Sequence, residues 1–218
     1  MRLRRTQAVY ITAFLLAIVL NLAARVFPGF AEWYAVRVYP LIVGTLGRLC
    51  SLVPFSVAEI LLYAGILLIL AGLVLLVLRR LRLRRGILIL VRVVIALFLM
   101  FTLNCGINYH RMTFAERAGF EIRVSSVEEL AALCERLAEE LNQAAQEITV
   151  DSQGSLVITG DLEAEAVKAM QAAGEEYPEL AGYYPRPKPV AGYWILSYQQ
   201  LQGIYSPFTV EANYNSDM

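Results

Sequence analysis

Few side chains in this 218-residue sequence have the types and spacing needed for chemistry. The single histidine, His110, has no second imidazole with which to hold a metal ion, and none to activate a nucleophile. The cysteines Cys50, Cys105 and Cys134 are odd in number and far apart, and none belongs to a C-x-x-C pair. Neither a disulfide framework nor a thiolate metal site is therefore indicated, and Cys134 is interpreted as a buried small hydrophobe on a helix face in preference to a reactive thiol.

Carboxylates and arginines are more numerous, but their patterns favour structural roles. The carboxylates gather on the polar side of one predicted amphipathic helix, where a solvated face is the default interpretation; they are Glu128, Glu129, Glu135, Glu139 and Glu140. No glycine-rich phosphate loop and no H-E-x-x-H motif occurs in the sequence. Taken alone, the sequence therefore predicts no catalytic residue, no metal ligand and no nucleic-acid partner.

The composition of the chain is that of a membrane protein. Hydrophobic residues make up 58% of the chain, charged residues 17%, and the mean hydropathy is +0.54, a combination rare in soluble domains. Three apolar stretches are long enough to cross a bilayer, at about 7–24, 55–78 and 86–108. The lipid bilayer is thus the first predicted partner, and the chain is expected to be a multi-pass protein of the cell membrane.

Arginines predict how these spans are oriented. They precede the first span, and five of them lie between the second and third spans in RRLRLRR, residues 79–85. Positively charged flanks stay in the cytoplasm, so we expect a cytoplasmic N-terminus and an extracytoplasmic C-terminal part. The predicted domains are a membrane anchor, 1–108, with an interfacial segment at 37–52, and an outer α+β domain, 109–218.

Two charges lie within or at the edge of the predicted spans. Arg92 lies within two turns of the cytoplasmic arginines, so its side chain can extend toward the headgroups. Glu59 lies near the outer start of the second span, where a charge costs little. With so few polar residues in the spans, a transporter core is disfavoured.

The pattern of the outer part, residues 109–218, predicts helices followed by a strand. Ser126 and Glu129 form a capping-box signature for an amphipathic helix up to residue 148, and Asp161 is a plausible N-cap for a helix up to about residue 176. A short strand at 155–159, extended PRPKP at 185–189, and a short helix around 194–202 are also predicted. The fold class is therefore a mainly α membrane protein with three transmembrane helices followed by a small α+β extracytoplasmic domain.

The last predicted element is a strand, 208–214. Its letters alternate, which puts Thr209, Glu211 and Asn213 on one side. No second strand follows it, so we expect an unpaired strand edge, which favours association.

Three stretches of the sequence resemble a family of uncharacterised three-pass bacterial membrane proteins that contain a domain of unknown function. They are PFSVAEILLY, GINYHR and, most specifically, KPVAGYWILSYQQLQGIYSPFTVEANYN. The resemblance implies that full-length relatives continue into a helix bearing H-E-x-x-H and a later acidic segment, the arrangement of a zinc-dependent peptidase. It also implies that strand 208–214 accepts a peptide substrate by strand addition, flanked by Thr209, Glu211 and Asn213.

On this resemblance, the chain is the membrane anchor and front part of a zinc metallopeptidase-like protein. We expect it to be truncated before the zinc ligands, so that it would be inactive as given and would hold no zinc of its own. The alternative is a non-catalytic membrane protein in which the amphipathic helix and the open strand dock a partner protein on the outer face.

Overall fold

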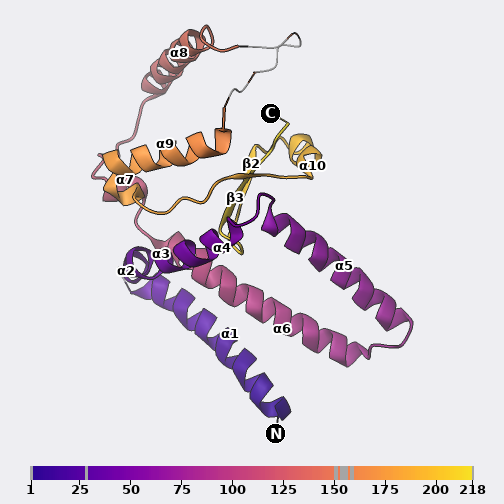
Figure 1. Cartoon of the computed structure of the whole chain (residues 1–218). Helices are drawn as coiled ribbons and strands as arrows, with labels where there is room; N and C mark the ends of the chain where they lie inside the picture. Colours follow the sequence, from indigo (N-terminus) through magenta and orange to yellow (C-terminus); the bar gives the residue numbers. More distant parts are fainter. Residues whose placement is uncertain (1, 28, 150–151, 153–156, 158–159, 218) are drawn as a thin grey trace.

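The computed structural model describes residues 2–27, 29–149, 152, 157 and 160–217 of the chain (Figure 1). Most of the described elements are helices, and the three strands come near the C-terminus. In chain order the elements are α1 (Arg2–Val26), α2 (Phe30–Arg37), α3 (Tyr39–Ile42), η1 (Val43–Gly47), α4 (Arg48–Cys50), α5 (Val57–Val77), α6 (Leu83–Phe101), η2 (Thr102–Gly106), η3 (Asn108–His110), α7 (Phe114–Arg117), α8 (Val127–Ala144), α9 (Leu162–Glu176), η4 (Pro178–Leu180), β1 (Lys188–Pro189), α10 (Tyr193–Tyr198), β2 (Gly203–Ser206) and β3 (Glu211–Tyr214).

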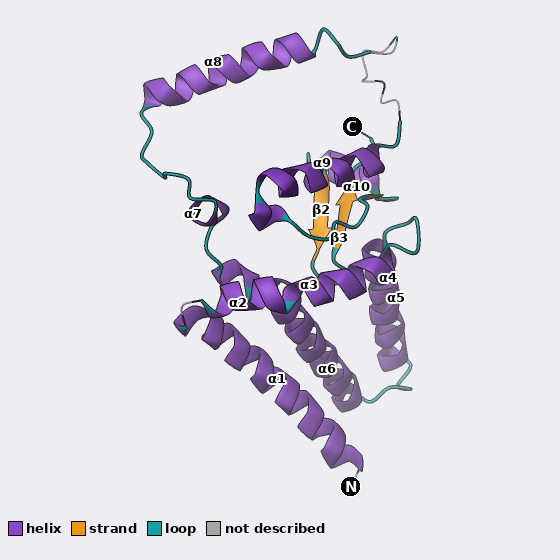
Figure 2. Ribbon diagram, turned by 60° about the vertical axis from the view of Figure 1, so that its left-hand side comes forward, coloured by secondary structure: helices purple, strands orange, loops and turns teal. Residues whose placement is uncertain are grey.

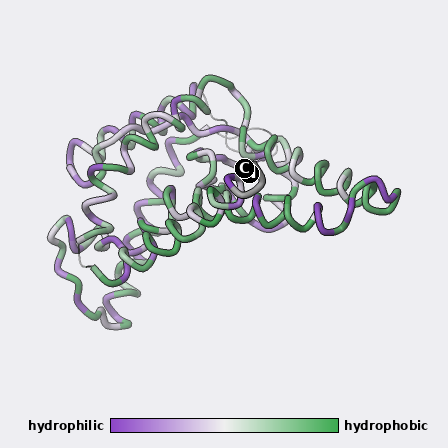
Figure 3. Tube along the Cα trace, turned by 90° about the horizontal axis from the view of Figure 1, so that it is seen from below, coloured by the Kyte–Doolittle hydropathy of each residue, from purple (hydrophilic) through white to green (hydrophobic). Residues whose placement is uncertain are grey.

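Three helices are long and apolar enough to cross a membrane, as the composition predicts. They cover Arg5–Val26, Val57–Val77 and Leu83–His110, and the tube in Figure 3 is largely green along them. Together with the small three-stranded sheet, they confirm the predicted fold class of a mainly α membrane protein with a small α+β part.

The first and third spans pack against each other through polar and small residues. Asn21 of α1 donates its amide to the Thr102 hydroxyl and to the carbonyl of Ala17, both at 2.8 Å. A Cβ added at Gly106 would lie 3.2 Å from Asn21 Oδ1, so glycine permits the close approach. Near the other end of the pair, the Arg92 guanidinium lies over the Tyr10 ring of α1 at 5.5 Å from the ring centre, which is a cation–π contact.

Helix α5 lies apart from this pair. It is joined to α6 by a short turn, and the two helices diverge from that turn toward the sheet (Figures 1 and 2). None of its described residues is buried. The end of α5 far from the turn is instead held by the C-terminal part of the chain, as described below.

The segment from α2 to α4 crosses the ends of the spans on the side of the sheet (Figure 2). Ala31 and Tyr34 of α2 are buried against Ala24 of α1 and Ile107. The Tyr34 hydroxyl donates to the carbonyl of Leu103 at 2.8 Å. This cluster ties the segment to α1 and to the end of the third span.

The predicted helices of the outer part are present. Ser126 and Glu129 form the expected capping box of α8, which ends at Ala144, sooner than predicted. Cys134 of this helix is exposed, so its predicted burial is wrong for the described residues. Asp161 caps α9 by accepting from the N–H of Ala164. The strand predicted at 155–159 lies outside the described residues except for Val157.

The prediction for the C-terminal strand is wrong in two respects. Residues 207–210 form a turn, and β3 begins only at Glu211, because Val210 takes a left-handed φ of 56° that a strand cannot continue through. The expected unpaired edge is also absent from β3, which lies between β1 and β2 in the sheet order β1-β3-β2.

Candidate functional site

The C-terminal sheet gathers residues that are distant in sequence. β3 pairs antiparallel with β2 through the turn at 207–210, and parallel with β1, where Lys188 lies beside Asn213. β1 comes from the proline-rich stretch, whose two paired residues suffice to place the Lys188 side chain next to β3. The sheet lies beside the start of α5 (Figure 1).

Glu211 and Lys188 form a buried ion pair at the start of α5. Lys188 Nζ lies 2.6 Å from Glu211 Oε1, and the two side chains are 5% and 2% exposed. Lys188 Nζ also donates to the carbonyl of Cys50, at the end of α4. The Glu211 carboxylate accepts from the N–H groups of Val57 at 3.2 Å and Ala58 at 2.9 Å, so it also satisfies the first turn of α5 and interacts favourably with the helix dipole.

The surroundings of this pair set its charge state. Burial alone would raise the pKa of Glu211, but the hydrogen bonds from Lys188 and from the N–H groups of Ala58 and Val57 bring it below the ordinary carboxyl value. Burial and the neighbouring Glu211 raise the pKa of the Cys50 thiol. Glu211 is therefore a charged structural group, and Cys50 stays protonated.

A second carboxylate holds the same end of α5 to the C-terminal part. The Glu59 carboxylate accepts from the N–H of Ala191 at 2.9 Å and from that of Gly192 at 2.7 Å. Tyr63, one turn further along α5, donates to it at 2.5 Å. The Ser56 hydroxyl caps α5 by accepting from the Glu59 N–H.

The residues predicted to flank a substrate strand are buried. Thr209, Glu211 and Asn213 are 2%, 2% and 6% exposed. Glu211 points to α5 and Lys188, and the Asn213 amide oxygen has no hydrogen-bond partner among the described residues. None of the three lines the neighbouring groove, to which the turn at 207–210 contributes Val210 and β3 contributes Ala212.

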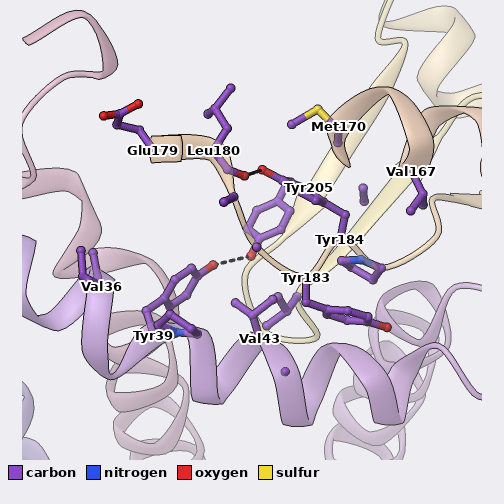
Figure 4. A pocket seen from close by; sticks show the side chains of 18 of the residues that line it. Val36, Tyr39, Val43, Val167, Met170, Glu179, Leu180, Tyr183, Tyr184 and Tyr205 are labelled. Carbon is purple, nitrogen blue, oxygen red and sulfur yellow. Dashed lines mark hydrogen bonds between the residues drawn. The ribbon is translucent and has the colours of Figure 1, made fainter. Parts of the chain in front are cut away.

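That groove is a cavity of about 760 Å³ between the sheet and the segment that crosses the spans (Figure 4). Val36, Tyr39 and Val43 form its membrane-side wall, and Val167 and Met170 of α9 line it on another side. Most of the remaining lining comes from the sheet and from the chain that leads into it, residues 178–187, and Arg48, Arg111 and Arg117 complete it. The groove is mostly apolar, with tyrosines and arginines at intervals.

The polar groups of the groove are held in place by neighbouring side chains. The hydroxyls of Tyr39 and Tyr205 are 3.0 Å apart and join the membrane-side wall to β2 (Figure 4). The Arg48 guanidinium lies 5.0 Å from the centre of the Tyr183 ring. Arg111 and Arg117 both pair with Glu32, at 3.3 Å and 3.0 Å.

β2 is an edge strand beside this groove. The Asn215 N–H donates to the carbonyl of Gln202 at 2.8 Å. Hydrogen-bonded and non-bonded pairs alternate along an antiparallel ladder, so the backbone N–H and C=O groups of Gly203 and Tyr205 point away from β3. Tyr205 also lines the groove, and the strand is largely exposed. A free strand edge and a groove for side chains therefore lie next to each other.

Sequence reasoning missed Lys188 and the role of Glu59. Lys188 lies in a proline-rich stretch, a context typical of solvated chain, and its partner is 23 positions away. For Glu59 a signal was available, since Ser56 and Glu59 have the spacing of a helix start, but the carboxylate binds the chain at Ala191 and Gly192 instead of its own N-cap. His110, at the end of η3, is exposed.

A zinc site requires three or four convergent ligands. Among the residues that the structure describes, no group of three His, Cys, Asp or Glu side chains could hold a metal ion. The described residues by themselves thus do not supply the ligands of a zinc site.

The chain matches a known protein family over most of its length. The profile of a family described as "Protein of unknown function (DUF3810)" matches residues 34–218. No curated protein and no solved structure matches the chain.

The buried pair gives a testable prediction. Lys188→Met leaves the Glu211 charge buried without its partner, and we expect a loss of about 3–5 kcal/mol in the stability of the C-terminal part. Pulse proteolysis of the purified chain in detergent measures it. The control is Lys168→Met, because Lys168 pairs with Glu165 at an exposed position and its loss should leave the unfolding midpoint unchanged. Equal midpoints for the two variants would contradict a structural role for the pair.

Proposed function

Since the chain belongs to the family described as a protein of unknown function, DUF3810, through residues 34–218, we propose that it is the membrane-anchored, peptide-binding part of a zinc metallopeptidase-like protein. The observation that carries the proposal is the free edge of β2 beside the apolar groove. An extended peptide that adds to this edge would place alternate side chains in the groove. The resemblance of the C-terminal stretch to peptidase-like relatives supports the same assignment.

The proposal moves the substrate strand from β3 to β2. β3 is paired on both sides, so it has no edge to offer a peptide. The buried residues Thr209, Glu211 and Asn213 would then have a structural role, since Glu211 binds the sheet to the first turn of α5. In this proposal the described residues bind the substrate. A zinc ion, held by ligands outside the described residues, would supply the activated water.

The arginine distribution supports a cytoplasmic N-terminus and an extracytoplasmic sheet and groove. In a variant lacking the native cysteines, Val124→Cys should react with a membrane-impermeant maleimide on intact cells, because Val124 lies between α7 and α8 and is 96% exposed. Arg80→Cys, in the loop between α5 and α6, should react only after permeabilisation. The reverse pattern would overturn the orientation.

Peptide binding is testable with unfolded β-casein carrying a fluorescent label. We expect the chain in nanodiscs to raise the anisotropy of the casein, and an apolar hexapeptide to compete. The same hexapeptide with alternate amides methylated should compete about tenfold more weakly, because it loses one or two backbone hydrogen bonds.

A pair of variants locates the binding. Val167→Asp places a charge in the groove wall and should weaken casein binding, whereas Val124→Asp, at a fully exposed position, should not. Equal binding by the methylated and unmethylated peptides would show that strand addition is not the mode of recognition.

The peptidase part of the proposal is tested on the gene. We expect the DNA that follows the Met218 codon to encode H-E-x-x-H within about 20 codons in one of its frames. A protein extended through that motif should bind one zinc ion and cleave casein, and should lose cleavage when the glutamate of the motif is replaced by glutamine. A different downstream sequence would sink the peptidase assignment and leave the second candidate, partner docking, which the exposed face of α8 favours.

A further inference from the structure

Helix α8 has an apolar face that the described residues leave uncovered. Val127, Leu130, Leu137 and Leu141 are 78%, 57%, 49% and 70% exposed. The helix lies apart from the sheet and the spans in both views (Figures 1 and 2). An exposed leucine stripe of this length indicates an interaction surface.

The spacing along this stripe is that of a coiled coil. Its residues are separated alternately by three and four positions, which is the a/d pattern of a heptad repeat; they are Val127, Leu130, Cys134, Leu137, Leu141 and Ala144. Alanines at 131 and 138 flank the stripe on one side. Small residues at that position allow a second helix to approach closely.

We propose that α8 pairs antiparallel with α8 of a second copy of this chain. In one register every layer is apolar on both sides: Val127 lies opposite Ala144 of the second copy, Leu130 opposite Leu141, and Cys134 opposite Leu137. Val127 and Ala144 are the two ends of the helix, so this register overlaps the whole helix symmetrically. A twofold contact requires this kind of self-complementary surface.

The direction of α8 fits the same arrangement. Two copies in one membrane share the same orientation, so the twofold axis that relates them is parallel to the membrane normal. Antiparallel helices related by such an axis must lie across the normal. In both Figure 1 and Figure 2, α8 runs across the direction of the spanning helices.

Charge argues for a second copy in preference to a lipid surface. The face opposite the stripe carries several glutamates, and the first turn holds Glu128 and Glu129. An acidic helix is repelled by anionic headgroups, whereas in the pair these carboxylates stay in solvent. An 18-residue helix is marginal alone, but anchoring in a membrane raises the effective concentration of its partner.

Disulfide cross-linking in membranes tests the pair and its direction. In a chain whose native cysteines are replaced by serine, Val127→Cys combined with Ala144→Cys should form dimers, because these positions face each other across the pair. The two positions are about 26 Å apart within one helix, so they cannot be bridged within a chain. Val127→Cys alone should form none. Dimers from that single variant would indicate a parallel pair, and no dimers from either would overturn the proposal.

Mass photometry in nanodiscs provides an independent measurement. We expect a dimer for the unmodified chain, a monomer for Leu137→Glu, and a dimer for Ala132→Glu, which places the same charge on the opposite face. Leu137 is half-exposed in the single chain, so the variant should fold. A monomeric unmodified chain, or dimers of Leu137→Glu, would contradict the proposal. It does not rest on peptide binding, and casein binding by a monomeric Leu137→Glu variant would separate the two.

Discussion

The ion pair between Lys188 and Glu211 is the interaction on which the arrangement of the C-terminal part depends. It connects β1, β3, the end of α4 and the first turn of α5 through two side chains that are almost fully buried. Burying two charges is costly, and the cost is offset only where the remaining hydrogen-bonding capacity is used. Here the carbonyl of Cys50 and the N–H groups of Val57 and Ala58 use it. A sheet with strands of two and four residues would not be stable alone, so the membrane helix α5 is part of its support.

The parts of the fold that depend on local pattern could be predicted from the sequence. Span length and apolar composition predicted three candidate membrane helices, and the capping residues Ser126 and Asp161 predicted where α8 and α9 begin. The start of β3 could not be predicted, because the left-handed backbone of Val210 is imposed by the turn and not by the valine itself.

The candidate site was harder to predict because polar side chains of β3 face the interior while an apolar one faces the groove. Alternation grouped Glu211 and Asn213, which do lie on one face of β3, with Thr209, which lies in the turn before the strand. Polar residues on a strand normally indicate a face in solvent. Here that face is buried, because Glu211 binds Lys188 and the N-terminus of α5. Both partners are remote in sequence, so no local spacing could reveal them. Ala212, on the other face of β3, and Val210 of the preceding turn line the groove instead.

The two ends of helix α5 are held in different ways. It diverges from α6 beyond their connecting turn (Figure 2), and its other end is fastened to the sheet by Glu211 and to the chain at Ala191 and Gly192 by Glu59. The helix is therefore connected to α6 by a short turn at one end and held to the C-terminal part by hydrogen bonds at the other. Since helices tilt to match bilayer thickness, a thinner or thicker membrane would rotate the sheet relative to α3 and so change the width of the groove.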